Sequence, residues 1–264
     1  MARVRRLRAL VAVALIAAGL AAAPPAAGIT FGNPDGNDHP YVGALVANFN
    51  GTNFLLCSGT MISSTVFLTA GHCTDFLTSQ GVDPSDVYVS FDPTFDDSSP
   101  LVQAVGYHTN PNYGYKGPNG FADPHDIAVV ILGTPVSGLT GQLPTLHQLN
   151  SASPGQVYTA VGYGTVRNDK TKGPASLFFD GERRWVDGTM NSLNKAWLRL
   201  SENPSTGNGG TCYGDSGGPH FFKGTRVLSS ITVTGDTWCR STDVTYRVDT
   251  ASARAFLGQY VSLP

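Results

Sequence analysis

The stretch from Cys212 to Pro219, with the sequence CYGDSGGP, constrains this chain more than any other. Its serine, Ser216, lies between glycines, and small residues at such a turn allow a substrate carbonyl to approach the backbone closely. The backbone amides of Gly214 and Ser216 are then placed to point at one spot and form an oxyanion hole. A bare Gly-Asp-Ser-Gly turn is also compatible with an ordinary loop, so the assignment depends on partner residues elsewhere in the chain.

Residues 1–28 have the features of a secretory signal peptide followed by any short pro-segment. Four arginines lie within the first eight residues, an apolar run extends from Ala9 to Ala23, and small residues follow. The run is shorter than the ~20 apolar residues that a membrane span requires. We therefore expect a secreted, extracellular protein that has no membrane attachment after the signal is removed, with a retained anchor as the alternative.

The charge that remains after this removal excludes some partners. Of the 17 basic residues, 13 remain against 19 acidic ones, so the net charge is about −6. Such a surface does not favour nucleic acid or an anionic membrane. About 235 residues are enough for one large domain or two small, closely packed ones, and we expect a monomer.

The four cysteines indicate disulfides rather than a metal site. Cys57, Cys73, Cys212 and Cys239 form no CxxC pair, so the sequence gives little support for zinc. In an exported protein an even number predicts two disulfides, with three possible pairings. Pairing of sequence neighbours is the simplest, and each closure would stabilise the fold by roughly 3–4 kcal/mol.

Short β-like segments separated by turns dominate the rest of the chain, which contains 31 glycines and 17 prolines. Asn50-Gly51 is a hairpin signal. One helical turn is expected at Gly71–Cys73, and a terminal helix from Ala251 to about Val261, capped by Asp249 or Thr250. The predicted strands are Tyr41–Asn48, Phe54–Ile62, Val66–Ala70, Val87–Phe91, Val102–Tyr107, Ile127–Leu132, Gln156–Tyr163, Arg183–Val186, Ala196–Leu200, His220–Phe222, Val227–Thr234 and Val244–Val248.

Three separate segments together indicate nucleophilic catalysis. They contain His72 after a predicted strand, Asp126 before one, and Ser216 on the glycine-flanked turn. A serine hydroxyl is a weak nucleophile at neutral pH, so it needs a base within hydrogen-bond reach and a third group that orients the base. Imidazole suits this role because it titrates near working pH. Each residue alone also has a structural explanation, and His125 is the competing histidine beside Asp126.

In the order His, Asp, Ser, these segments resemble the chymotrypsin/trypsin family of serine endopeptidases. Thr69–Cys73 is similar to the family's histidine motif, Asp126–Ala128 to its aspartate motif, and Gly214–Pro219 to its serine motif. The resemblance extends from Ile29 to the C-terminus. Weaker similarities lie at Cys57–Thr60, Val161–Gly164 and Tyr246–Val248.

This resemblance implies an all-β fold of two six-stranded antiparallel β-barrels with a C-terminal helix and the active site between the barrels. The first barrel would span residues 29–141, and the second barrel with the helix residues 142–264. The resemblance implies a peptidase that acts on protein or peptide substrates and requires no metal or cofactor. It also implies the disulfides Cys57–Cys73 and Cys212–Cys239.

The same resemblance implies a role for each catalytic residue. His72 would act as general base and then general acid, Asp126 would orient it, and Ser216 would be the nucleophile. The amides of Gly214 and Ser216 would hold the oxyanion.

An activation pair follows from the resemblance as well. In this family a newly freed N-terminal amine pairs with the aspartate before the serine, here Asp215, and so orders the oxyanion hole and the specificity pocket. Ile29 stands at the matching N-terminus, although Thr30 and Phe31 depart from the family's Ile-Val-Gly-Gly. Cleavage after Gly28 would then activate the enzyme directly.

The resemblance places Gly210 at the floor of the primary pocket. Trypsin-type enzymes have Asp there, so this position does not support selectivity for Lys or Arg, and we predict an uncharged or apolar substrate side chain. Asp243, from the opposite wall, offers basic selectivity as the alternative. The predicted substrate-binding positions are Gly210, Thr211, Val233, Thr234, Gly235 and Asp243.

Two other functions share parts of the pattern. A catalytically silent homologue that serves as a binding protein typically loses a triad residue, whereas all three are present here. A secreted esterase has a GxSxG string, which Gly214–Gly218 fits, but the order Ser…Asp…His expected there is reversed in this chain.

Overall fold

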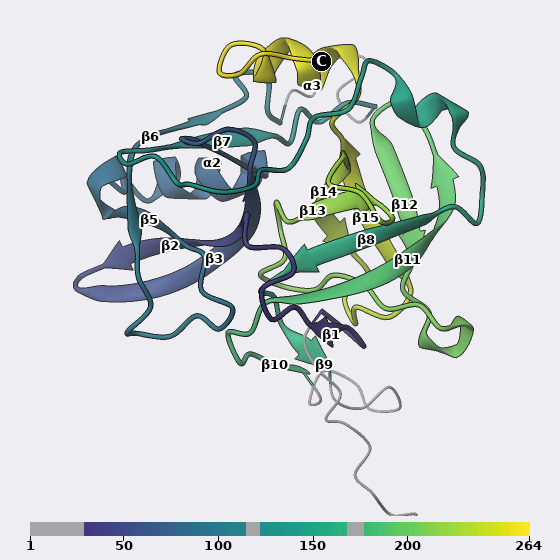
Figure 1. Ribbon diagram of the computed structural model, residues 1–264, viewed down its shortest axis with the longest axis horizontal. Coiled ribbons are helices and arrows are strands. Elements are labelled where there is room, and N and C mark those ends of the chain that lie inside the picture. The colour runs from purple at the N-terminus through teal and green to yellow at the C-terminus, as the bar shows by residue number, and fades with distance from the viewer. Residues whose placement is uncertain (1–28, 115–121, 168–176) are drawn as a thin grey trace, which may run out of the picture.

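The computed structural model describes residues 29–114, 122–167 and 177–264, which form two antiparallel β-barrels and a short C-terminal helix (Figure 1). The predicted signal peptide lies outside these residues. The twelve predicted strands are all present, so the prediction of an all-β, two-barrel fold is confirmed.

Six strands close the first barrel in the order β2, β3, β4, β7, β6, β5. The hairpin between β2 and β3 turns at Asn50 and Gly51, whose φ angles of 53° and 87° are the left-handed values that an Asn-Gly turn provides. Closure pairs every strand on both sides and leaves no free sheet edge. The strands are β2 (Val42–Phe49), β3 (Thr52–Met61), β4 (Val66–Thr69), β5 (Val87–Ser90), β6 (Val102–Thr109) and β7 (Ala128–Leu132).

The second barrel is closed by the pairing of β8 with β11, which completes the order β8, β11, β12, β15, β14, β13. The two-residue strand β1 (Asn33–Pro34) pairs with β11, and β9 (Val166–Arg167) pairs with β10 (Leu177–Phe178). The barrel strands are β8 (Val157–Gly162), β11 (Arg184–Leu193), β12 (Trp197–Ser201), β13 (Pro219–Phe222), β14 (Leu228–Gly235) and β15 (Thr242–Arg247). Single turns of 3-10 helix lie at Pro84–Asp86, Gln148–Ser151 and Pro204–Thr206.

Two elements are longer than their local sequence predicts. β11 continues to Leu193 through residues with low strand propensity, because β8 and β12 pair with it from either side. The helix α2 (Gly71–Ser79) exceeds the predicted single turn, because Cys73 and Leu77 bury one of its faces in the barrel core.

The terminal helix α3 (Ala251–Leu257) is shorter than predicted and has Thr250 as its N-cap. The Thr250 hydroxyl accepts a hydrogen bond from the amide of Ala253 at 3.1 Å. Asp249, the other predicted cap, instead pairs with Arg247 at 2.8 Å. Among the described helices, none is long and apolar enough to cross a membrane.

One buried guanidinium joins the two barrels. Arg183, at the start of the second-barrel strand β11, is 0% exposed. It donates to the carboxylate of Asp35 at 2.7 Å and to the first-barrel carbonyls of Val42 and Phe91 at 3.1 and 2.9 Å. Burial opposes ionisation of Asp35, but hydrogen bonds from His39 and Arg183 outweigh it and lower the pKa of that carboxyl group.

Candidate active site

The first barrel brings His72 and Asp126 together at its edge. β4 pairs with β7 so that Thr69 lies opposite Ala128, which places the chain leaving β4 beside the residue that precedes β7. Nδ1 of His72 lies 3.0 and 3.2 Å from the two carboxylate oxygens of Asp126, and the His72 amide donates to the same carboxylate at 2.9 Å. The carboxylate therefore fixes both the ring and the start of α2, and its acceptor role favours hydrogen on Nδ1.

Gly71 makes this close approach possible. A Cβ atom at Gly71 would lie 3.0 Å from the Ile127 nitrogen and 3.1 Å from the nearer Asp126 oxygen. These distances are shorter than ordinary van der Waals contacts, so a side chain here would push Asp126 away from His72.

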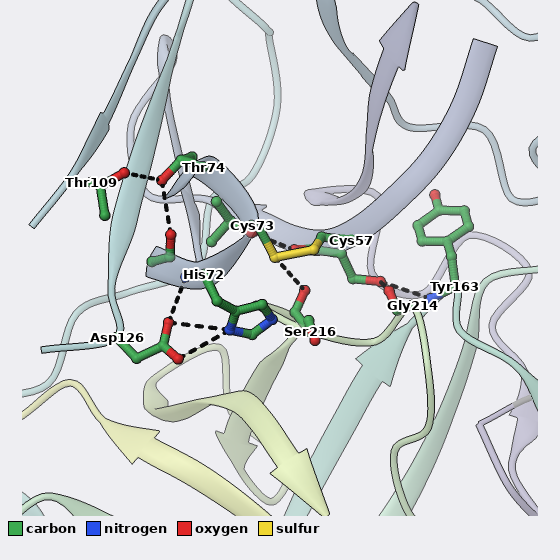
Figure 2. Close-up of a disulfide and its surroundings, with 12 residues drawn as sticks. Cys57, His72, Cys73, Thr74, Thr109, Asp126, Tyr163, Gly214 and Ser216 are labelled. Atoms are coloured by element: carbon green, nitrogen blue, oxygen red, sulfur yellow. Dashed lines mark hydrogen bonds and ion pairs between the residues drawn. A yellow bond between two sulfur atoms is a disulfide. The ribbon is translucent and has the colours of Figure 1, made fainter. Parts of the chain in front are cut away.

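The second barrel supplies the predicted nucleophile, Ser216, on a tight turn before β13. Gly214 and Gly217, on either side of Ser216, have φ angles of +97° and +79°, which glycine adopts without strain. A Cβ atom at Gly217 would lie 2.2 Å from the Thr69 hydroxyl oxygen, so the turn packs directly against the strand end that carries His72. Figure 2 shows the imidazole of His72 lying between Asp126 and Ser216.

The predicted base, His72, and the predicted nucleophile, Ser216, are not hydrogen-bonded to each other through their side chains. In the described part of the chain, the hydrogen bonds of His72 go to Asp126, and none reaches the Ser216 hydroxyl. Such bonds are commonly long in unliganded enzymes and tighten when substrate binds. The His72 side chain is 30% exposed and the Asp126 side chain 6%, so substrate can reach the ring but not its partner.

The backbone amides predicted for the oxyanion hole are free. Within the residues that the structure describes, neither Gly214 N–H nor Ser216 N–H donates a hydrogen bond. Ser58 holds the loop in place, because its hydroxyl donates to the Gly214 carbonyl at 3.0 Å and accepts from the Tyr163 amide at 3.0 Å. Sequence analysis did not identify this role of Ser58.

Two disulfides brace the site, with the pairing implied by the family resemblance. Cys57–Cys73 ties β3 to α2 beside His72. Cys212–Cys239 ties the nucleophile loop to the segment that follows β14. Cys57, His72 and Cys73 also lie close enough together for a metal site, but the disulfide leaves no thiolate to bind an ion.

Asp215 is fully buried behind the nucleophile. Its carboxylate accepts hydrogen bonds from the amides of Gly164 at 2.8 Å and Cys212 at 2.9 Å. Burial raises the pKa of Asp215 to about 7 against the lowering effect of these two bonds. Among the described side chains no cation pairs with this carboxylate, so a positive charge brought to it would be stabilised.

The predicted partner, Ile29, packs against strands β8 and β11 of the second barrel. Ile29 is 0% exposed and packs with Ala160 and Val186. The next residue, Thr30, bridges to the pocket floor: the Gly210 amide donates to the Thr30 carbonyl at 3.1 Å. No direct contact between Ile29 and Asp215 is recorded in the described residues.

A cavity of about 290 Å³ opens beside Ser216 and corresponds to the predicted primary pocket. Four predicted positions line it, whereas Gly210 and Asp243 are buried behind its surface. Asp236 also lines it, but its carboxylate accepts four backbone hydrogen bonds from the turn before β15. The predicted positions in the lining are Thr211, Val233, Thr234 and Gly235.

The sequence offered Asp243 as a contact for a basic substrate side chain, but in the structure it faces a histidine. Its carboxylate lies 3.2 Å from Nε2 of His220, and both side chains are 1% exposed. The same nitrogen is 3.0 Å from the Thr232 hydroxyl. Asp243 therefore forms a second buried His–Asp pair beneath the pocket.

Sequence analysis missed a second acid at this position, Glu202. This residue follows β12 and is 0% exposed. A Cβ atom at Gly210 would lie 2.1 Å from Glu202 Cγ, so the Glu202 side chain fills the space that a side chain at the pocket floor would occupy. One feature of the sequence could have drawn attention to Glu202: it is the sole acidic residue between Asp187 and Asp215.

Comparison with known proteins points to the same family as the three sequence motifs. The trypsin family model matches residues 32–255. The chain is 29% identical to brachyurin from Leptuca pugilator over 198 residues, which cover 71% of this chain and 78% of brachyurin. It is 28% identical to the snake venom serine protease catroxase-2 from Crotalus atrox over 190 residues, 69% of this chain and 68% of that protein.

Solved structures agree on the fold. The HL collagenase structure has a TM-score of 0.62 at 16% identity and covers 84% of this chain and 93% of its own. Neuropsin, a serine protease of mouse brain, has a TM-score of 0.65 at 22% identity, with 87% and 98% covered. At these identities the likeness concerns the arrangement of the backbone.

Proposed function

The chain belongs to the trypsin family of serine proteases, and from this membership we propose that His72, Asp126 and Ser216 form the catalytic triad of a secreted endopeptidase. As a member of the family, it is a hydrolase that acts on protein or peptide substrates. The two disulfides fit an oxidising, extracellular environment.

The proposed reaction passes through an acyl-enzyme. Ser216 Oγ attacks the substrate carbonyl while His72 Nε2 takes the hydroxyl proton, and the amides of Gly214 and Ser216 hold the oxyanion. His72 then gives the proton to the leaving amine as the peptide C–N bond breaks. Water, activated by the same imidazole, attacks the ester and releases the acid product and Ser216.

The observation that carries this proposal is the contact between His72 and Asp126 beside the Ser216 turn. The 3.0 Å contact fixes the imidazole against a buried carboxylate, and the nucleophile comes from the other barrel. The free amides at Gly214 and Ser216 add the electrostatic element that acyl transfer requires.

We propose that Ile29, once freed by cleavage after Gly28, pairs through its amine with Asp215. The buried position of Ile29, its contact with Ala160 and the unpaired Asp215 carboxylate support this pairing. The bridge from Thr30 to Gly210 would then transmit ordering of the N-terminus to the pocket floor. N-terminal sequencing of fully active enzyme tests the pairing, and a first residue other than Ile29 would contradict it.

The triad is tested with a fluorophosphonate probe and a peptide-substrate library. We expect labelling that Ser216→Ala abolishes, and a loss in kcat on the order of 10⁴-fold for Asp126→Asn, because the imidazole then adopts the wrong tautomer. Correctly processed protein that is not labelled would favour a silent binding homologue. Turnover of small esters without cleavage of any peptide would favour an esterase.

A further inference from the structure

We propose that Glu202 is the acidic residue of the primary pocket and selects substrates with arginine or lysine at the cleaved bond. This inference rests on the proposed function, because it assigns a role within the same active site. It departs from the prediction of an uncharged substrate side chain.

The geometry places the Glu202 carboxylate directly behind two glycines, one of which, Gly235, lines the pocket. The Cβ position of Gly210 lies 2.4 Å from Oε1 of Glu202, and the Cβ position of Gly235, in the pocket wall, lies 3.9 Å from the same oxygen. Both residues are glycines, so no side chain separates the carboxylate from the cavity at either position. A carboxylate carried by the end of β12 thus takes the place of one on the floor residue itself.

This carboxylate lacks the partners that buried acids normally have. Within the described residues neither Glu202 oxygen makes a well-formed hydrogen bond, and the amide of Thr211 provides a weak interaction alone. Burial, and then the negative charges of Asp243, Asp236 and Asp215, raise its pKa. A guanidinium or ammonium group entering the cavity would supply both the missing hydrogen-bond donors and the missing positive charge.

The two other acids near the cavity have different surroundings. The carboxylate of Asp236 accepts four backbone amides, whereas Asp243 faces His220 at 3.2 Å without a well-formed hydrogen bond to either of its oxygens. Glu202 differs from both because its carboxylate lies against the two glycines at positions 210 and 235, where no side chain covers it. Asp243 contributes a negative field below the floor rather than a direct contact.

The experiment compares fluorogenic peptides that differ only at the residue before the cleaved bond: arginine, its uncharged isostere citrulline, and leucine. Enzyme concentrations are normalised by labelling of Ser216 with the fluorophosphonate probe. We expect wild-type kcat/KM to be at least about 30-fold higher for the arginine peptide than for the citrulline peptide. The arginine side chain supplies the hydrogen-bond donors and the positive charge that the buried Glu202 carboxylate lacks, whereas citrulline supplies no charge.

Two matched variants locate the acid. Glu202→Gln should reduce the arginine-to-citrulline ratio to about 3-fold or less. Asp243→Asn should keep a ratio of at least about 10-fold. The ratio is measured within one enzyme preparation, so partial misfolding lowers all three rates together and leaves the ratio unchanged.

Several results would overturn the assignment while leaving the triad intact. One is wild-type enzyme that is labelled at Ser216 and cleaves the leucine or citrulline peptide as fast as the arginine peptide. Another is loss of the preference in Asp243→Asn with its retention in Glu202→Gln. If Glu202→Gln is not labelled, the wild-type ratio still decides whether the pocket selects a cation, and Glu202→Asp, which shortens the carboxylate, should lower that ratio if Glu202 is the acid. Absence of labelling in the wild type contradicts the proposed function instead.

Discussion

The buried carboxylate of Asp215 makes the stability of the molecule depend on pH. Its pKa is about 7 in the folded chain against 3.8 for the ordinary group, because burial disfavours the charge. Between these values the folded state holds a proton that the unfolded state has released. The contribution of Asp215 to stability is therefore complete below about pH 4 and is lost as the pH rises through 7.

We expect the unprocessed chain to lose about 3 kcal/mol of unfolding free energy from this group between pH 5 and pH 8. The Asp215→Asn variant has no carboxyl group to titrate at this position. Its unfolding free energy, measured in urea, should therefore not show this loss of about 3 kcal/mol over the same pH range. The processed chain should also vary less, because the amine of Ile29 would neutralise the carboxylate. Equal pH slopes for the unprocessed chain and Asp215→Asn would contradict the assignment.

Among the elements, α2 depends on a covalent tie for its position. The Cys57–Cys73 disulfide fastens its first turn, which carries His72, to strand β3. The Cys212–Cys239 disulfide instead fastens the loop that contains Ser216 to the segment after β14. The two cross-links close chain segments of similar length, 16 and 27 residues apart, so their removal should cost similar stability but affect different parts of catalysis.

Replacing either cysteine pair by alanine should lower the unfolding free energy by about 3 kcal/mol, as measured by urea unfolding. The Cys57/Cys73 double variant should lower kcat/KM for all substrates alike, since His72 loses its anchor. The Cys212/Cys239 double variant should also change the ratio between substrates, since its disulfide borders the pocket. Unchanged substrate ratios in the second variant would show that the disulfide does not shape the pocket.

At the scale of the whole molecule, Arg183 holds the barrels and the N-terminal segment in one arrangement. Its guanidinium bonds to Asp35 near the N-terminus and to carbonyls of the first barrel, while its backbone leads into the second. Removing one member of a buried ion pair leaves the other charged and unpaired, which costs more than the loss of the contact itself.

Arg183→Met should therefore lower the unfolding free energy by about 3–5 kcal/mol in urea unfolding, because the buried Asp35 carboxylate loses the guanidinium and keeps His39 as its side-chain partner. Lys195→Ala, at an exposed position between β11 and β12, is the matched control and should change it by less than about 0.5 kcal/mol. A loss below about 1 kcal/mol for Arg183→Met would show that Arg183 is not needed to hold the barrels together.

Across the molecule, local sequence patterns predicted those features, strands and turns, that are decided by residues adjacent in the chain. Alternating apolar residues located the strands, and the hairpin signal at Asn50-Gly51 located a turn. The extent of α2 and β11 was not predictable from such patterns, because partners distant in sequence decide where those elements end. Glu202 was missed for the same reason: its side chain reaches the pocket floor only after β12 has paired with β15.

The division of the site between the barrels sets the order in which catalytic competence can arise during synthesis. His72 lies in α2 and Asp126 just before β7, and all of these residues are complete by position 132, whereas Ser216 follows β12 and precedes the last three strands of the second barrel. A ribosome that has polymerised the first two hundred residues has thus produced the proposed base, His72, and its proposed orienting partner, Asp126, without Ser216. A prematurely terminated product of that length would lack the proposed nucleophile, so we expect it to be incapable of proteolysis.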